Sequence, residues 1–185
     1  MFKLCFSFLF LISIGSALAA DSKHPLHSHN DYEQDRPILA AFDNNFKSIE
    51  VDIWLSNNEV KIAHNPWHFK GTLEEMYLIP LQKMVDAGTI NADAENPILL
   101  WIDIKDIRQK INKRLAAVLE KYPMIGNEVR VILTGSKRLK RKFVLDFPHI
   151  AVDRDENTLE DLQDSPTPFH WFTIKWSKNF TWNGE

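Results

Sequence analysis

The chain has 185 residues, a formal net charge of −3 at pH 7, and 44% hydrophobic residues. This length and composition allow one domain with a sizeable core. The slight acidity argues against bulk binding of nucleic acid, because such binding depends on neutralising many phosphate charges.

Residues 1–19 predict a cleaved signal peptide. Lys3 precedes a short apolar run, and residues 17–19 form a small-x-small cleavage site. The apolar run is too short to span a membrane. Cys5, the only cysteine, lies within the leader, so the mature chain would have no disulfides. We therefore expect residues 20–185 to form one domain that is exported, either periplasmic or secreted.

Strand-like and helix-like segments alternate along the rest of the chain. Short apolar or alternating runs predict strands, and apolar residues three or four apart predict helices. We expect strands at 25–29, 47–55, 60–63, 98–104, 128–133, 149–152 and 169–174, and helices at 37–45, 72–87 with a break near Pro80, 107–122, 137–145 and 157–162. This order predicts a parallel sheet with helical crossovers.

Three carboxylates fall on these predicted strands. Glu50 and Asp52 are two residues apart and therefore share one face of their strand, and Asp103 interrupts the most apolar run. An isolated pair of this kind is more often salt-bridged on a solvated face. Like charges facing a covered interior, however, repel each other unless a cation or a proton lies between them. Three converging carboxylates favour a hard divalent cation, Mg²⁺ or Ca²⁺, over zinc.

Two histidines flank the carboxylate pair. His29 and His64 each follow a strand-like run. Although a lone histidine is more often structural, phosphodiester cleavage needs one group that takes a proton and another that gives one, and imidazole suits both tasks. Lys105 lies on the same predicted face as Asp103 and would hold a phosphoryl oxygen. A solvated lysine at a strand end is the equally weighted alternative.

Four segments taken together resemble the phospholipase C-like phosphodiesterase superfamily, which includes glycerophosphodiester phosphodiesterases and sphingomyelinases D. They are H-S-H-N-D-Y at 27–32, S-I-E-V-D-I-W at 48–54, K-I-A-H at 61–64 and W-I-D-I-K at 101–105. The resemblance is greatest to the branch that opens with H-S-H-N-D-Y. It implies a TIM barrel that cleaves phosphodiesters with two histidines and a bound Mg²⁺ or Ca²⁺.

The resemblance also implies a role for each matching residue. The spacing to Glu50 favours His29 over His27 as the first catalytic histidine. The matching residues are His29 and His64 as the catalytic pair, Glu50, Asp52 and Asp103 as metal ligands, and Lys105 as the strand lysine of the sphingomyelinase D group. We expect His27, Asn30 and Trp176 to contact the substrate.

Two departures from the superfamily pattern bear on substrate and fold. Residues 30–32 read N-D-Y where the glycerophosphodiesterases carry P-E-N-T, so the expected substrate is either a glycerophosphodiester or a phospholipid-type phosphodiester. Removal of the leader leaves 166 residues, whereas a full barrel needs about 250. We therefore expect a TIM-barrel-type α/β fold of about six strand–helix units that is incomplete at its C-terminus.

Two alternatives remain open. The basic run at 137–142 is most often a solvated helix face, and contact with anionic lipid headgroups, giving a transient membrane-surface interaction, is the less favoured alternative. The expected activity is that of a secreted, metal-dependent phosphoric diester hydrolase. The rival is a non-catalytic, truncated barrel that binds an anionic ligand or a partner.

Overall fold

The structure is a computed structural model that describes residues 26–147, 150–156, 171–174 and 181. The expected leader, the expected helix at 157–162 and Trp176 lie outside the described residues. Within the described ranges, no helix is both long enough and apolar enough to cross a bilayer.

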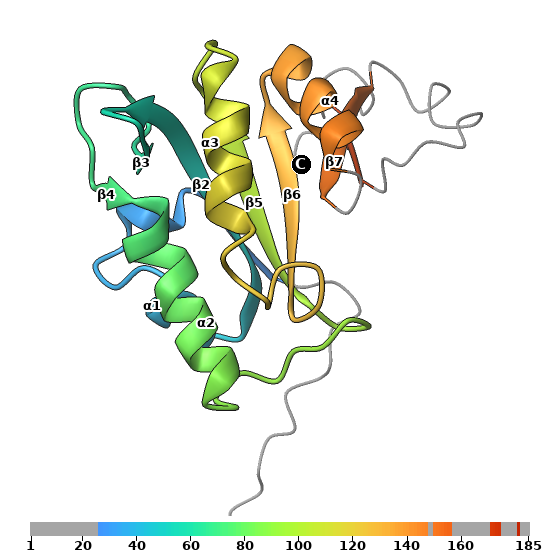
Figure 1. Cartoon of the computed structure of the whole chain (residues 1–185). Helices are drawn as coiled ribbons and strands as arrows, with labels where there is room; N and C mark the ends of the chain where they lie inside the picture. The colour runs from blue at the N-terminus through green and yellow to red at the C-terminus, as the bar shows by residue number, and fades with distance from the viewer. Residues whose placement is uncertain (1–25, 148–149, 157–170, 175–180, 182–185) are drawn as a thin grey trace, which may run out of the picture.

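One mixed sheet of eight strands organises the described residues (Figure 1). The strand order is β4–β3–β2–β5–β6–β7–β8, and β1 pairs with β2 beside this path. The strands are Leu26–Ser28 (β1), Phe46–Ser56 (β2), Glu59–Ile62 (β3), Gly71–Thr72 (β4), Ile98–Ile104 (β5), Val129–Gly135 (β6), Ala151–Glu156 (β7) and Trp171–Ile174 (β8). In the described part of the chain β1 pairs with β2 and β8 pairs with β7, so the sheet is open and not a closed barrel.

This architecture confirms the prediction of an α/β fold of incomplete-barrel type. The expectation of a parallel sheet is wrong at β3 and β4, which pair antiparallel with their neighbours. The reason is the two-residue turn at Asn57 and Asn58, whose φ angles are 49° and 61°. A turn this tight joins only antiparallel strands, and asparagine tolerates positive φ better than most residues.

One edge of β2 carries two short strands that approach from opposite ends. β1 runs parallel to the first half of β2, where Ser28 pairs with Ile49. β3 runs antiparallel along the second half, where Ile62 pairs with Ile53. The residues that follow these two strands therefore meet beside the middle of β2. This meeting point is where the site described below lies.

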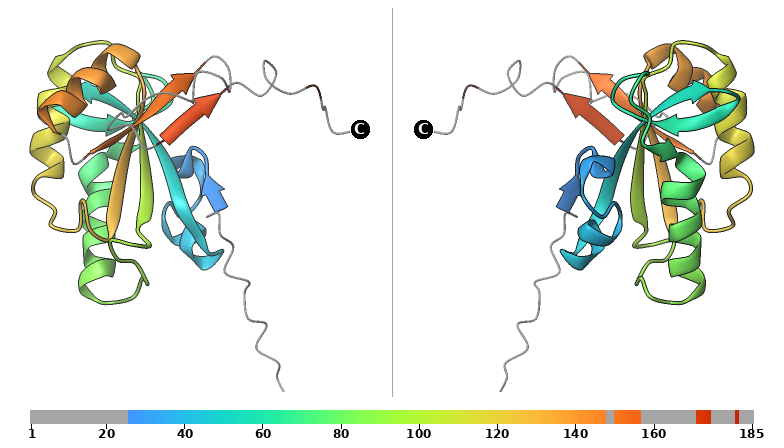
Figure 2. Two further views of the ribbon diagram at one scale, coloured as in Figure 1. Left: turned by 90° about the vertical axis from the view of Figure 1, so that its right-hand side faces the viewer. Right: turned by 90° about the vertical axis from the view of Figure 1, so that its left-hand side faces the viewer.

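The longer helices cover one face of the sheet. Figure 2 shows α2, α3 and α4 on the same side of the central strands. Ile49, Val51 and Ile53 of β2 belong to a core cluster that also contains residues of these helices. The helical segments are Asp31–Glu33 (η1), Leu39–Asp43 (α1), Glu74–Leu78 (η2), Ile79–Asp86 (α2), Lys110–Leu119 (α3) and Lys137–Asp146 (α4).

Several helix bounds differ from the sequence expectation. The helix expected at 37–45 is α1, which begins only at Leu39. Ile38 is not helical, because it has a φ of 64° and its N–H donates to Asp31 at 2.8 Å. Instead of 107–122, α3 begins at Lys110. The expected break near Pro80 is also absent, since the π-helical η2 runs directly into α2. Pro80 is the second residue of α2, directly after the π-helical turn.

Candidate active site

Glu50, Asp52 and Asp103 come together on the face of the sheet opposite the helical core. Asp52 on β2 pairs in register with Asp103 on β5. Glu50 precedes Asp52 by two residues, so strand alternation places the three on one face. Each of the three carboxylates has an oxygen within 4.8 Å of an oxygen of the other two. This geometry suits a single bound cation.

One oxygen of each carboxylate is buried without a hydrogen-bond partner among the described residues. These atoms are Glu50 Oε2, Asp52 Oδ1 and Asp103 Oδ1. Burial raises the pKa of Glu50, and the Asp52 and Asp103 carboxylates raise it further, whereas nearby His29 opposes the shift. Burial likewise raises the pKa of Asp103. Glu50 Oε2 is near His29 and Asp52 Oδ1 is near Lys105, so the negative charge of the three buried oxygens is only partly offset. Such a donor set fits a hard divalent ion.

Asp52 has a second function through its other oxygen. Its Oδ2 accepts a hydrogen bond from the Tyr32 hydroxyl at 2.8 Å and lies 2.9 Å from His64 Nδ1. Because a carboxylate oxygen accepts, His64 donates from Nδ1 and its Nε2 is left for proton exchange. Asp52 is fully buried, whereas the His64 side chain is 59% exposed. A buried carboxylate therefore orients a histidine that solvent and ligands can reach.

His29 is held in a similar way from the other direction along β2. Its Nδ1 is in close contact with Glu50 Oε2, and its side chain is 71% exposed. The backbone N–H of Asn30 also interacts with the Glu50 carboxylate. His29 and His64 thus flank the carboxylate group from β1 and β3, as the meeting of these strands requires.

Lys105 supplies a positive charge to the same group. Its Nζ lies 2.6 Å from Asp103 Oδ2 and 3.5 Å from Asp52 Oδ1. Partial burial would lower the pKa of Lys105, but the hydrogen bond to Asp103 and the charges of both aspartates raise it above its usual value. The raised pKa keeps Lys105 cationic, and its side chain is 30% exposed.

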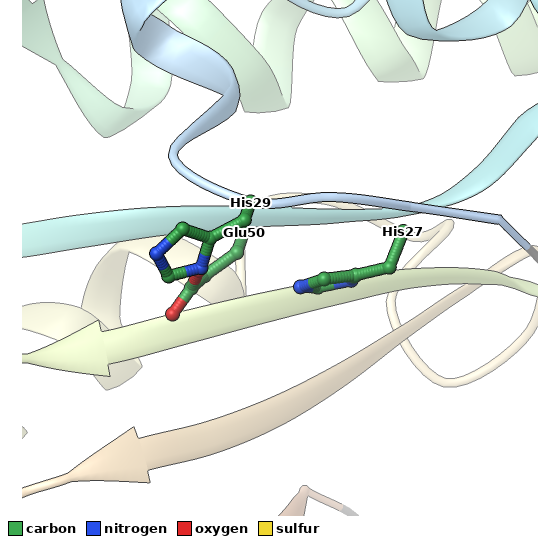
Figure 3. A group of neighbouring side chains, drawn as sticks. All are labelled: His27, His29 and Glu50. Carbon is green, nitrogen blue, oxygen red and sulfur yellow. The ribbon is translucent and has the colours of Figure 1, made fainter. Parts of the chain in front are cut away.

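His27 lies on β1, two residues before His29, and both histidines are exposed. Its Nδ1 is 2.8 Å from Ser48 Oγ, and its ring meets Trp101 edge to face. Figure 3 shows the imidazoles of His27 and His29 beside Glu50. Ligand atoms of these three residues also lie within 4.8 Å of one another, which makes a second candidate metal group that shares Glu50 with the first.

The loop that follows β1 is held by Asp31. This carboxylate is fully buried and accepts hydrogen bonds from Ser28 Oγ at 2.9 Å, the Ile38 N–H at 2.8 Å and the Tyr77 hydroxyl at 2.9 Å. It anchors the turn in which Asn30 adopts a φ of 48°. Asp31 is therefore a structural residue, and it places Asn30 and Tyr32 against the site.

The structure brings together every site residue predicted from sequence that it describes. These are His27, His29, Asn30, Glu50, Asp52, His64, Asp103 and Lys105. Sequence reasoning missed Tyr32, which donates to Asp52, although Tyr32 stands inside the H-S-H-N-D-Y segment. It also missed Ser48, Trp101 and Gly135. A Cβ atom on Gly135 would lie 2.0 Å from Asp103 Oδ1.

The basic run at 137–142 is not wholly solvated. Lys140 is 1% exposed and forms an ion pair with Asp153 of β7, which also accepts a hydrogen bond from Thr134 Oγ1 at 3.1 Å. The expectation of a solvated face is therefore wrong for Lys140. It holds for the exposed Lys137, Arg138, Arg141 and Lys142.

Comparison with known proteins adds the following similarities. A family model described as "AIM6-like phosphodiesterase domain" matches residues 19–126, a range that includes every site residue predicted from sequence that the structure describes. Proteins called "Altered inheritance of mitochondria protein 6" match from Lachancea thermotolerans, with 29% identity over 60% of this chain and 33% of the relative, and from Eremothecium gossypii, with 32% identity over 55% and 30%. A homologue from Arthroderma benhamiae is 25% identical over 52% of this chain and 38% of the relative. The matched stretch thus spans about a third of the length of these relatives.

Proposed function

The chain belongs to the family of AIM6-like phosphodiesterase domains, and from this premise we propose that it is a metal-dependent phosphoric diester hydrolase. One observation carries the proposal. Three carboxylates, each with one buried oxygen that lacks a hydrogen-bond partner in the described structure, lie between two accessible histidines. Hydrolysis of a phosphodiester needs a centre that neutralises the phosphate and two groups that exchange protons.

The carboxylate group is the proposed metal site. Glu50 Oε2, Asp52 Oδ1 and Asp103 Oδ1 would hold the ion, and their all-oxygen character favours Mg²⁺ or Ca²⁺. A divalent ion bound there would polarise a phosphoryl oxygen and offset the negative charge of the substrate. Lys105, which already contacts Asp103 and Asp52, would bind a second phosphoryl oxygen.

The two histidines are the proposed acid and base. Asp52 fixes the ring of His64 through Nδ1, and Glu50 fixes the ring of His29 through Nδ1. In both rings the remaining Nε2 is the atom that exchanges a proton. One histidine removes a proton from the attacking hydroxyl or water, and the other protonates the leaving alcohol.

The proposed substrate is a glycerophosphodiester or a phospholipid-type phosphodiester, met in solution or at a membrane surface. We also propose that the protein is exported after removal of residues 1–19, because this segment has the pattern of a signal peptide. Mass spectrometry of the exported protein should then find Ala20 as the first residue. Exported material that retains Met1 would contradict the proposed cleavage.

Turnover of bis(p-nitrophenyl) phosphate and of a panel of glycerophosphodiesters and lysophospholipids tests the activity. We expect it to depend on Mg²⁺ or Ca²⁺ and to disappear on chelation. His29→Ala and His64→Ala should each lower kcat by about 10²–10⁴-fold, the usual contribution of a proton-transfer group. The exposed His68 is the control position, and His68→Ala should have little effect. A protein that binds the metal ion but turns over no substrate would instead favour the non-catalytic alternative.

A further inference from the structure

His27 has no proton-transfer role in the proposed mechanism, yet its ring is held on two sides. On the neighbouring strand Ser48 pairs with it in register, and Ser48 Oγ lies 2.8 Å from His27 Nδ1. The ring of Trp101 on β5 meets the His27 ring at 78°, with 6.0 Å between centroids. The orientation of this imidazole is therefore defined by Ser48 and Trp101.

The hydrogen bonds around Ser48 have a direction. The indole Nε1 of Trp101 lies 3.0 Å from Ser48 Oγ, and an indole N–H can only donate. Ser48 Oγ therefore accepts from Trp101, and its own hydroxyl hydrogen remains available for donation to His27 Nδ1, which lies 2.8 Å away. A neutral imidazole that accepts at Nδ1 carries its hydrogen on Nε2.

This tautomer decides what His27 can bind. Ligand atoms of His27, His29 and Glu50 lie within 4.8 Å of one another. Figure 3 shows a ring nitrogen of His27 directed towards the side of the site occupied by Glu50 and His29. A nitrogen that carries hydrogen has no lone pair for a cation, but it donates well to an anionic oxygen. The group of two imidazoles and Glu50 is then not a second metal site.

We propose that Ser48 and Trp101 are positioning residues that hold His27 as the Nε2–H tautomer, so that His27 donates a hydrogen bond to a non-bridging oxygen of the bound phosphodiester. The phosphate-binding half of this inference rests on the proposed function. The tautomer half rests on the three contacts alone. Lys105 and His27 would then hold the phosphate from opposite sides, β5 and β1.

Nitrogen-15 NMR of the metal-free full chain tests the tautomer without any assay of activity. The expected spectrum has the hydrogen of His27 on Nε2. In Ser48→Ala and in Trp101→Phe, which keeps an aromatic ring but lacks the N–H, the population should move towards a mixture of both tautomers. Ser48→Thr, which keeps the hydroxyl, should restore the wild-type pattern. A hydrogen on His27 Nδ1 in the wild type, or a Ser48→Ala spectrum identical to wild type, would overturn the proposal.

Binding measurements test the role in phosphate recognition. By calorimetry with saturating Mg²⁺, His27→Ala and Ser48→Ala should each weaken the binding of inorganic phosphate, by about 10–100-fold for the loss of a hydrogen bond to a charged group. The affinity for Mg²⁺ itself should stay unchanged in both. In turnover the same variants should raise KM more than they lower kcat, and the double variant should be no worse than His27→Ala. Loss of Mg²⁺ affinity in His27→Ala would instead make His27 a metal ligand and overturn the proposal.

The two hypotheses fail in different ways. A wild-type protein that shows the Nε2–H tautomer and binds phosphate but has no turnover contradicts the proposed hydrolase and supports the inference. A wild-type protein with metal-dependent turnover whose Ser48→Ala variant keeps both the tautomer and the phosphate affinity contradicts the inference and supports the hydrolase.

Discussion

Gly135 is the position where a single methyl group should weaken metal binding although no proposed ligand is replaced. Its φ is +82°, and a Cβ atom there would lie 2.0 Å from Asp103 Oδ1, 2.7 Å from Ile104 O and 2.9 Å from Ile104 N. Contacts below 3.0 Å essentially never occur for real Cβ atoms, so Oδ1 must move by about 1 Å. Metal–ligand distances tolerate only about 0.2 Å.

The expected loss of stability has two parts. Forcing alanine into a left-handed conformation costs about 1–2 kcal/mol. Overpacking against Asp103 and the Ile104 backbone adds about 1–3 kcal/mol. Gly88 and Gly126 separate the two parts, because their φ angles are +62° and +93° and nothing lies within 4 Å of their Cβ positions. Gly88→Ala and Gly126→Ala should lose only the backbone part, about 1–2 kcal/mol.

The assay combines urea unfolding with calorimetric titration of Mg²⁺ and Ca²⁺. Displacement of a ligand's support typically weakens metal affinity by about 10–100-fold, and we expect at least this for Gly135→Ala. The control variants should bind the ions like the wild type. Asp103→Ala combined with Gly135→Ala should recover part of the lost stability and none of the ion binding. The reasoning is refuted if Gly135→Ala binds either ion with wild-type affinity, or if its stability loss equals that of the controls.

Two further predictions concern the carboxylates. Mg²⁺ or Ca²⁺ should raise the melting temperature of the wild type because the ion binds preferentially to the folded state. The Asp52→Asn variant should lose this response. An unchanged response in Asp52→Asn would show that Asp52 is not a metal ligand. The raised pKa values of Glu50 and Asp103 mean that their contribution to the stability of the metal-free protein is complete below the ordinary carboxyl range and is lost as pH rises through the raised values. The increase in melting temperature on adding Mg²⁺ should therefore grow with pH over this window, because the metal needs ionised carboxylates. Scanning fluorimetry with and without Mg²⁺ measures this increase. An increase that stays constant with pH would argue against ionisation-linked binding.

Local patterns in the sequence were sufficient to predict much of the fold. The apolar run from Ile98 to Ile104 is β5 in the structure, with the bounds expected. Strand alternation correctly placed Glu50 and Asp52 on one face, away from the core contacts of Ile49, Val51 and Ile53. These features follow from the two-residue period of a strand and from the burial of apolar side chains. Both depend on residues that are close together in the sequence.

The network within the site depended on tertiary structure. The sequence placed His29 and His64 near strand ends, but only the opposite approaches of β1 and β3 along one edge of β2 bring both to the carboxylates. One oxygen of Asp52 contacts Tyr32 and His64, and the other lies 3.5 Å from Lys105 Nζ without a hydrogen bond. No local sequence pattern predicts these contacts.

The same is true of the contacts that involve Ser48 and Lys140. Ser48 lies 53 residues from Trp101 in the chain, and their hydrogen bond exists only because β2 and β5 are neighbours in the sheet. Lys140 belongs to a run that reads as solvated, yet Asp153 on β7 pairs with it in the interior. Strand and helix formation depend on short-range propensity, whereas these contacts depend on strand order and register, which the whole core sets together.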